Sequence, residues 1–401
     1  MPIITQEEVN SFIHRLQLKT YATLTPIRKD GEEILNSRQT LETLQFALNN
    51  LEYIRAEFSK PDSVGILFKK ADTGLSRSFV IVPNASGVLE LIVITNQKLS
   101  SGEKSAEIGL LGSGNIKDVK YGVCVDTTVA EPRAVMKIEL GPVNGDENSK
   151  GHAAESLQRL VIEAERSQRY NSPHIVKSYM GPLYRHTIPV NADGLKARTA
   201  NYSEGSRDRL PRVEFNAVLM FAPYFGHALT TLFTGILTES EKIQIAEEKN
   251  AGRVPVICLK LIKEILHGLS AMHAVGDIHA DLDCGSILIK RDNETGIPTA
   301  GIFDFGFANN TGSITLDTSK ISQIVFEMLR DEPDFETLYD EGESDIGDDE
   351  SKALLIKYPF LRKFIVEDTD VVYTASQLLE ELNSLDQAPD APSKRSKLRS
   401  S

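Results

Sequence analysis

The residues of this chain that could do chemistry lie in four short motifs, and the first of them is a pair of glycines. Gly112 and Gly114 stand two positions apart within Leu111–Val119, between strand-like runs. Glycines at this spacing allow a tight turn and bring backbone N–H groups close to an anionic ligand. A plain hairpin turn is the simpler explanation of the pair by itself. The motif is not a Walker A loop, because no Gly-Lys-Ser/Thr follows at the required spacing.

The second motif is a lysine inside an apolar strand-like run, Ala134–Ile138. A buried ammonium group is costly, so Lys137 must either reach solvent or find an anion. Glu163 follows in a segment with helical spacing of its apolar residues. A pair between Lys137 and Glu163 would hold the ammonium toward the α- and β-phosphates of a nucleotide. The alternative is an edge-strand lysine that faces water.

The third and fourth motifs each contain an aspartate beside a strand-like run. Asp281 stands in a polar loop before such a run, where its carboxylate could approach a substrate hydroxyl. Asp304 follows Ile302 at a strand end and precedes Gly306, a position from which a carboxylate can coordinate Mg²⁺. Taken singly, each aspartate is more often a turn residue.

The elements that would carry these motifs follow from apolar periodicity. Thr5 and Glu8 fit a capping box ahead of a first helix, and a stronger amphipathic helix is predicted near Ser37–Phe58, ending at Lys60-Pro61. Its leucine stripe is more typical of core than of a partner groove. The other predicted segments are strand-like runs at 64–69, 78–82 and 88–95, strands around one helix over 107–185, a polar loop at 187–212, an apolar run at 213–225, and helices at 254–273 and 374–385.

The order of the four motifs resembles the protein-kinase signature set, over about residues 107–329. Gly112, Gly114 and Val119 match the glycine-rich loop, with Lys117 in place of its third glycine. Lys137 matches the lysine of the third kinase strand. Glu163 matches the glutamate of helix αC, because Ser172-Pro173-His174-Ile175-Val176 follows it as His-Pro-Asn-Ile-Val does in the family.

The second half of the resemblance covers the hinge and the catalytic loop. Phe221 falls at the gatekeeper position, and the hinge would be Ala222-Pro223-Tyr224, whose backbone groups at Ala222 and Tyr224 would pair with adenine. The remaining matches are His279 and Asp281 to His-Arg-Asp, Asp304-Phe305-Gly306 to Asp-Phe-Gly, and Asp317 with the apolar run 324–329 to helix αF.

The resemblance implies an α+β fold with two kinase-like lobes, the first rich in strands and the second mainly helical and reduced, preceded by an α/β extension. The implied divisions are an extension at 1–104, an N-lobe at 105–225 with an insertion at 187–212, a C-lobe at 226–385 with an acidic segment at 331–351, and a disordered basic tail at 386–401. Side chains 137, 163, 281 and 304 would converge in one cleft.

The resemblance also implies ATP and Mg²⁺ as cofactors and a role for each matched residue. Asp281 would accept a hydrogen bond from the attacking hydroxyl, and Lys137 would orient the phosphates. Nucleotide binding is expected from Gly112, Ser113, Gly114, Val119, Lys137, Glu163, Phe221, Ala222 and Tyr224, and metal binding from Asp304, Ser286 and Asp283.

The chain departs from the family at positions that bear on regulation and on the metal. Ala280 replaces the arginine that pairs with a phosphorylated activation loop, and the short segment between Asp304 and Asp317 has no Ala-Pro-Glu. We therefore expect no control by phosphorylation of this segment. Ser286 replaces the asparagine that binds a second Mg²⁺. Asp283 replaces a lysine that touches the γ-phosphate, so it either helps to hold a metal or weakens ATP binding.

We expect an atypical ATP-dependent protein kinase that transfers the γ-phosphoryl group to a Ser/Thr hydroxyl of a protein. One alternative is a pseudokinase, a nucleotide-binding scaffold that regulates a partner protein. The other is the same fold acting on a small molecule or transferring AMP. Because the peptide platform is reduced, a protein substrate would dock elsewhere, for which 331–350 and 187–212 are candidates.

Composition limits the other classes of function. The net charge of −13 argues against general nucleic-acid binding, which needs a basic surface. No apolar run is long enough to span a bilayer, and the first residues lack the pattern of a signal peptide. The cysteines are odd in number and far apart, so we expect reduced packing cysteines in a cytoplasmic protein. Short C-lobes are familiar in bacterial effector kinases, so the location would be a host cytoplasm if the protein is a secreted effector.

Overall fold

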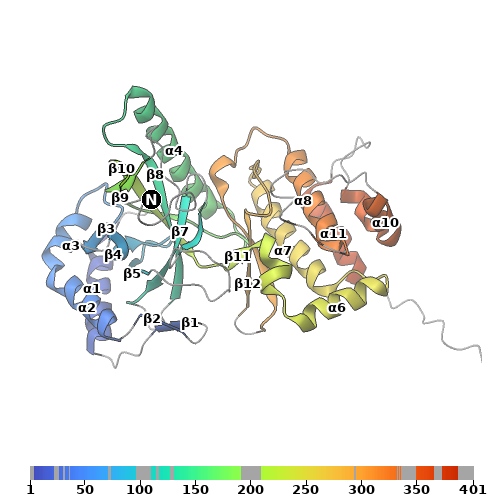
Figure 1. The fold of residues 1–401 in the computed structure, drawn as a ribbon, viewed down its shortest axis with the longest axis horizontal. Coiled ribbons are helices and arrows are strands. Elements are labelled where there is room, and N and C mark those ends of the chain that lie inside the picture. Colours follow the sequence, from blue (N-terminus) through green and yellow to red (C-terminus); the bar gives the residue numbers. More distant parts are fainter. Residues whose placement is uncertain are drawn as a thin grey trace, which may run out of the picture. The chain divides into compact units, whose positions relative to one another are not determined.

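The structure is a computed structural model of the 401-residue chain, and its contacts divide the chain into two compact units. Unit 1 comprises residues 1–169 and 176–225, and unit 2 comprises 170–175 and 226–401. Both contain helices and antiparallel strands, so the chain has a mixed α+β fold (Figure 1). The residues described are 4–21, 27–29, 32–35, 37–70, 74–95, 110–113, 117–126, 131–190, 209–292, 295–331, 333, 335, 349–364 and 373–386.

Three helices at the start of unit 1 confirm the predicted amphipathic segments. The capping box is present, because Glu8 N donates to Thr5 Oγ1 and Thr5 N donates to the Glu8 carboxylate. The predicted helix near 37–58 is instead two helices that meet at Asn50, whose side chain donates to Phe46 O. Asparagine competes in this way with the backbone bonds of a helix. The helices are α1 (Gln6–Tyr21), α2 (Ser37–Asn49) and α3 (Leu51–Phe58).

One antiparallel sheet runs through unit 1. Its strands lie in the order β3-β4-β5-β7-β8-β10-β9, and β6 pairs with β7. Because β5 pairs with β7, the predicted extension at 1–104 and the predicted N-lobe at 105–225 share one sheet. The strands are β3 (Ile66–Lys70), β4 (Gly74–Pro83), β5 (Leu89–Thr95), β6 (Leu110–Ser113), β7 (Lys117–Cys124), β8 (Glu131–Pro142), β9 (Tyr179–Pro189) and β10 (Arg212–Pro223).

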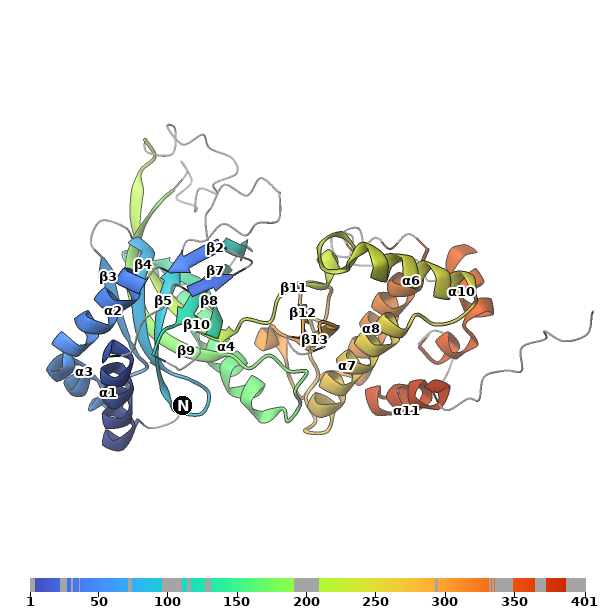
Figure 2. The same ribbon diagram turned by 90° about the horizontal axis from the view of Figure 1, so that it is seen from below.

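The two faces of this sheet carry different clusters of buried side chains. Alternate residues of a strand point to opposite faces, and in β5 the side chains of Leu91 and Val93 pack toward helices α1–α3. Ile92 and Ile94 pack on the other face, with Val135 and Phe221. Burial on both faces explains the near-continuous apolar run of this region. Figure 2 shows α1–α3 together on one side of β3–β5.

The ends of the sheet approach each other, and a buried ion pair joins its middle strands. Lys69 Nζ in β3 donates to Arg185 O in β9 at 2.6 Å, although these strands lie at opposite ends of the order. Arg133 in β8 donates to both carboxylate oxygens of Glu90 in β5, at 3.1 and 2.9 Å. Tyr179 Oη in β9 donates to the same carboxylate at 2.9 Å. These bonds connect the strands of residues 1–95 directly to the strand that bears Lys137.

Unit 1 also contains a long helix and a short hairpin. Helix α4 (Glu147–Arg169) packs against β8 and β9 and is the one helix predicted among the strands of 107–185. A short hairpin of β1 (Ile27–Lys29) and β2 (Glu32–Leu35) was not predicted. Most of the predicted insertion at 187–212 lies outside the described residues, between β9 and β10.

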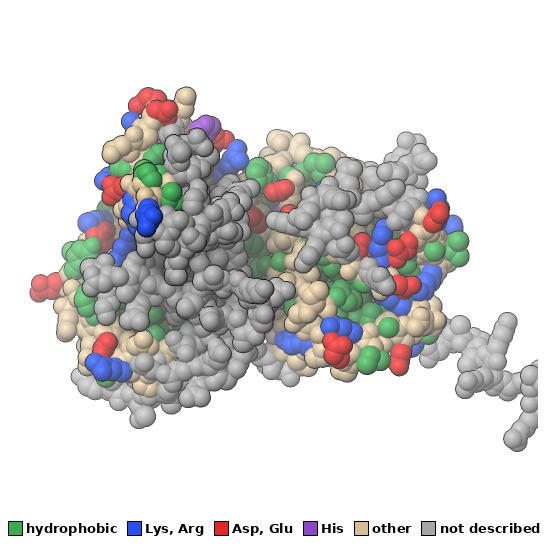
Figure 3. Space-filling model, in the orientation of Figure 1, with side chains coloured by type: hydrophobic (Ala, Val, Ile, Leu, Met, Phe, Trp, Pro, Cys, Tyr) green, Lys and Arg blue, Asp and Glu red, His purple; other side chains and the backbone are tan. Residues whose placement is uncertain are grey.

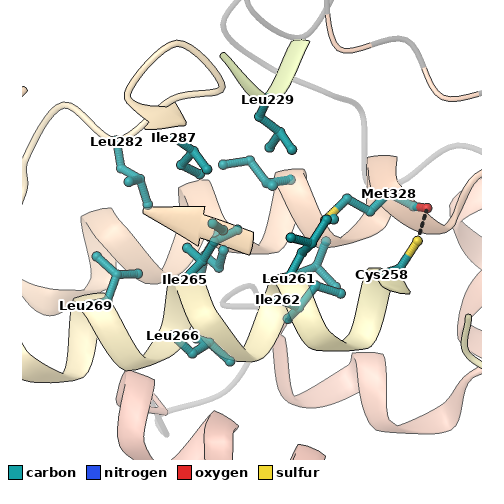
Figure 4. Close-up of a cluster of buried hydrophobic side chains, with 14 of the residues drawn as sticks. Leu229, Cys258, Leu261, Ile262, Ile265, Leu266, Leu269, Leu282, Ile287 and Met328 are labelled. Carbon is teal, nitrogen blue, oxygen red and sulfur yellow. Dashed lines mark hydrogen bonds between the residues drawn. The ribbon is translucent and has the colours of Figure 1, made fainter. Parts of the chain in front are cut away.

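Unit 2 is mainly helical and is built around helix α7, which matches the predicted helix at 254–273. Leu261, Ile265 and Leu269 repeat along α7 and are fully buried with residues of the small sheet and of α8. Figure 4 shows these side chains together, with the Cys258 thiol donating to Met328 O at 3.7 Å. The helices are α6 (Glu239–Asn250), α7 (Val256–His273), α8 (Ile314–Leu329), α10 (Asp349–Lys357) and α11 (Ala375–Asp386), with short turns η2 (Leu229–Thr231), η3 (Leu232–Ile236), η4 (Phe305–Phe307) and η5 (Pro359–Phe364).

A three-stranded antiparallel sheet carries the predicted catalytic loops of unit 2. Its order is β11-β12-β13, with β11 (His227–Ala228), β12 (Ile287–Arg291) and β13 (Pro298–Ile302). The segment 170–175 belongs to this unit because Ile302 N donates to His174 O at 2.8 Å. Most of the acidic segment 331–351, and the tail beyond residue 386, lie outside the described residues. On the face shown in Figure 3, acidic and basic side chains are interspersed over the described surface.

A glycine in α7 provides a test of the packing in unit 2. A Cβ at Gly268 would lie 2.8 Å from Ile302 Cδ1 and 3.0 Å from the backbone oxygen of His174. We expect Gly268→Ala to lower the free energy of unfolding by about 1–3 kcal/mol through overpacking, although alanine is the better helix former. Gly151→Ala in α4 is the matched control, because nothing lies within 4 Å of its Cβ, and it should stabilise by up to ~1 kcal/mol.

Urea denaturation followed by far-UV circular dichroism measures both variants, since the chain has no tryptophan. Equal stability of Gly268→Ala and wild type would contradict the close approach of α7 to residues 174 and 302.

Candidate functional site

The glycine motif lies on a hairpin of β6 and β7. Gly112 is opposite Val119, and Ser113 is opposite Asp118. Gly114 lies outside the described residues. The motif therefore begins in β6 and ends in the paired strand β7, as both the phosphate-binding and the plain-hairpin interpretations require.

Lys137 lies in the strand next to this hairpin, paired with Asp118 of β7 on one side and Leu219 of β10 on the other. Its ammonium is 3.0 Å from Glu139 Oε1, and the two side chains are only 11% and 12% exposed. Glu163 is fully buried on α4, the helix that packs against β8. The structure thus brings the strand of Lys137 and the helix of Glu163 together, and it gives the lysine a near neighbour, Glu139, that the sequence did not single out.

The predicted gatekeeper and hinge lie at the end of β10. Phe221 is fully buried and stacks on Tyr179 with ring centroids 5.7 Å apart. Ala222 pairs with Ala134 of β8, and Tyr224 N donates to Pro132 O at 3.2 Å. Adenine pairing through the Tyr224 amide would therefore have to replace an existing backbone bond.

In unit 2, Asp317 at the first turn of α8 fixes the backbone just before Asp281. Its carboxylate accepts hydrogen bonds from His279 N at 2.8 Å and Ala280 N at 3.0 Å, and it lies 2.9 Å from His273 Nε2. Asp317 is 1% exposed. Burial alone would raise the pKa of Asp317, but the bonds from His273, His279 and Ala280 together hold it below its usual value. The carboxylate is therefore an ionised anchor for this loop.

Asp281 and Asp304 lie at the same end of the β12–β13 hairpin. Ile287 pairs with Ile302, so the loop that enters β12 and the residues that leave β13 are adjacent. Two bonds hold them together: Phe303 N donates to Ser286 O at 2.8 Å, and His279 Nε2 lies 2.9 Å from Phe303 O. A carbonyl oxygen only accepts, so this His279 nitrogen carries the hydrogen. Asp281 is exposed and Asp304 is half-buried.

The backbone is strained at Ala280, next to Asp281, and at Asp304 itself. Ala280 and Asp304 both have φ of 65°, in the left-handed region, and Asp304 has ψ of 63°. For alanine this conformation costs about 1–2 kcal/mol. Such strain persists where surrounding contacts determine it and is concentrated at functional sites. At Ala280 the contact is the bond from its N–H to Asp317.

The other two predicted metal ligands bond to each other. Ser286 N donates to Asp283 Oδ1 at 2.7 Å, Asp283 N donates to Ser286 Oγ at 2.9 Å, and that hydroxyl donates to Asp283 O at 2.9 Å. Ser286 is also buried. Across the described part of the chain, no group of three or more His, Cys, Asp or Glu side chains could hold a metal ion.

The short segment between Asp304 and α8 is held at several points. Ile278 and Asn309 exchange two backbone bonds, of 2.8 and 3.1 Å. The Asn309 side chain accepts from the amides of Thr311 and Gly312, and Ser313 caps α8. The segment therefore has a defined conformation without a phosphate group.

Sequence reasoning missed His273 and Glu139. His273 occupies the last turn of α7 and had no motif to mark it. Glu139 could have been found from strand periodicity, because residues two apart in a strand share a face and Lys137 was already identified.

Comparison with known protein families gives no match, and no curated protein is significantly similar to the chain. Among the described helices, none is long and apolar enough to cross a membrane. The three cysteines are free and buried, and burial raises the pKa of Cys258 and of Cys284 to about 12. These thiols have the environment of packing residues.

Proposed function

We propose that the protein is an atypical kinase-like phosphotransferase that uses ATP and Mg²⁺ to phosphorylate a Ser/Thr hydroxyl of a protein. The observation that carries the proposal is the pair of bonds from the His279 and Ala280 amides to Asp317. A buried, ionised carboxylate that fixes two successive amides orients the next residue, Asp281. An exposed aspartate on a rigid loop is suited to accept a hydrogen bond from an attacking hydroxyl.

The neighbouring groups support the same chemistry. Asp304, at the end of β13, would hold Mg²⁺, which when bound neutralises charge on the phosphate oxygens. Lys137 and the β6–β7 hairpin would bind the phosphates, and Phe221 would border the adenine. The proposed fold is a two-lobed kinase-like one, with residues 105–225 as the N-lobe and residues 226–385 as the C-lobe.

The proposal includes the absence of a phosphorylation switch in the segment that follows Asp304. Ala280 cannot pair with a phosphate, and the segment is already held by Asn309 and Ser313. We expect transfer by protein that has been treated with phosphatase, and we place the activity in a cytoplasm, where ATP is available. This would be a host cytoplasm if the protein is a secreted effector.

A nucleotide-binding scaffold without transfer is the second candidate. The observation that favours it is the reciprocal bonding of Asp283 and Ser286, which occupies the hydroxyl that would otherwise serve a second Mg²⁺. Stabilisation of the protein by Mg-ATP without any turnover would favour this function. Action on a small molecule, or transfer of AMP, remains a variant of the first proposal that the mass of the product distinguishes.

Consumption of ATP with candidate substrates tests the proposal. Wild type should turn over ATP, and Asp281→Ala and Lys137→Ala should each lower kcat by about 10²–10⁴. Asp292→Ala, in a surface turn of unit 2, is the matched control and should keep wild-type turnover. Equal turnover by wild type and both variants would dismiss the assigned roles.

A further inference from the structure

A lysine of β8 and a histidine of β9 lie close to the carboxylate of Glu139 in unit 1. Lys137 Nζ lies 3.0 Å and His186 Nε2 lies 3.5 Å from Glu139 Oε1, and the His186 side chain is 14% exposed. Glu139 in β8 and Tyr184 in β9 are both paired with Ala217 of the strand between them. His186 is two residues from Tyr184 along β9 and therefore lies on the same face.

A second lysine reaches this group from β3. Lys69 Nζ lies 4.4 Å from the centre of the Tyr184 ring and donates to Arg185 O at 2.6 Å. Burial, and then the charge of Lys137, lower the pKa of Lys69. We call Lys69, Lys137 and His186 the basic cluster.

We propose that the basic cluster is a binding site for the polyphosphate of a nucleoside triphosphate, and that Glu139 is an internal counter-ion which the polyphosphate must displace. The inference rests on the proposed function for the identity of the ligand. It adds Lys69 and His186 as binding residues and Glu139 as an inhibitory residue. Lys137 and His186 lie beside one carboxylate that is only 12% exposed, and Lys69 lies on the nearby Tyr184 ring. Lysine and histidine side chains can hydrogen-bond to a phosphate group as they do to a carboxylate.

The position of Glu139 explains how it would compete with a polyphosphate for the Lys137 ammonium. It is two residues from Lys137 on the same face of the strand, so its carboxylate stays within reach of the ammonium. If the Lys137 ammonium is released from Glu139 for only about one-tenth of the time, a ligand that needs the released ammonium binds about ten-fold more weakly than it would to the released state alone. The strand that supplies Lys69 belongs to residues 1–95, so the inference also gives this region a direct role in ligand binding.

Isothermal titration with Mg-ATP, and separately with inorganic triphosphate, tests the inference on the full chain. Glu139→Gln should bind both probes about ten-fold more tightly than wild type. Lys69→Met should bind them on the order of ten-fold more weakly. Both effects should disappear when Lys137→Met is added. Glu155→Gln and Lys150→Met, which change the same charges on the exposed face of α4, are the matched controls and should bind as wild type.

The outcomes separate the inference from the proposed function. If Lys137→Met abolishes binding while Glu139→Gln and Lys69→Met bind as wild type, the inference is overturned and the proposed function stands. If no variant, including Glu139→Gln, binds either probe, both are overturned. Glu139→Asp keeps the charge but withdraws it by one methylene, so it replaces Glu139→Gln if that variant does not fold, and it should also bind more tightly than wild type.

Discussion

Asp317→Ala is expected to destabilise unit 2 by about 3–5 kcal/mol and to abolish the proposed phosphoryl transfer. The substitution leaves the amides of His279 and Ala280 without their acceptor and removes the partner of His273. Loss of one partner from a buried charged network costs this much because the remaining groups stay desolvated. Asp317→Asn retains one acceptor oxygen and should lose less stability.

The contribution of Asp317 to the free energy of unfolding should fall as the pH is lowered. Its pKa in the folded protein is below the usual value, so the carboxylate stabilises the fold above the unfolded pKa of about 4. This contribution is lost as the pH falls through the lower, folded pKa. The difference in unfolding free energy between wild type and Asp317→Asn should therefore be full at neutral pH and shrink below pH ~4.

Urea denaturation at several pH values measures this difference, with Asp349→Asn as the control. Asp349 is an exposed aspartate at the start of α10, and its replacement should leave stability within about 0.5 kcal/mol. A difference between Asp317→Asn and wild type that does not change between pH 7 and pH 3 would show that the carboxylate does not act as an ionised anchor.

Glu90→Ala should have an effect of similar size on unit 1. Burial would raise the pKa of Glu90, but the hydrogen bonds and charge of Arg133 outweigh it and hold the pKa below its usual value. Removal of the glutamate leaves the Arg133 guanidinium buried and the Tyr179 hydroxyl without an acceptor. A loss of about 3–5 kcal/mol is expected.

A double-mutant cycle isolates the pair. The double variant Glu90→Ala with Arg133→Met should lose less unfolding free energy than the sum of the losses in the two single variants. The reason is that each single variant leaves one charge buried without its partner, whereas the double variant removes both charges. Glu42→Ala removes an exposed glutamate paired with Arg38 and is the control for the loss of a surface ion pair. Additive effects of the two buried substitutions, measured by urea denaturation, would contradict the pairing.

Local patterns in the sequence were enough to predict much of the fold. The Thr5 capping box, the helix at 254–273 and the apolar strand-like runs around 78–95 depend on residues close in sequence, and all are present. The break at Asn50 was missed because the leucine stripe continues across it. The polar β1–β2 hairpin has no apolar alternation and gave no strand signal.

Long-range pairings could not be predicted in the same way. Glu90 and Arg133 are both charged residues in apolar runs, but nothing local indicates which partner each will find. Asp317 was identified by its place before an apolar helix, whereas its bonds to residues 279 and 280 depend on how α8 packs. The same holds for Lys69, whose position beside Tyr184 follows only from the curvature of the sheet.

A structure of the protein with Mg²⁺ and a non-hydrolysable ATP analogue tests the central claim most directly. The account predicts Lys137 Nζ within hydrogen-bonding distance of an α- or β-phosphate oxygen, Asp304 bound to Mg²⁺, and Asp281 facing the γ-phosphate. A nucleotide bound without contact to Lys137 and Asp304, or a protein that takes up no nucleotide at saturating concentration, would contradict it.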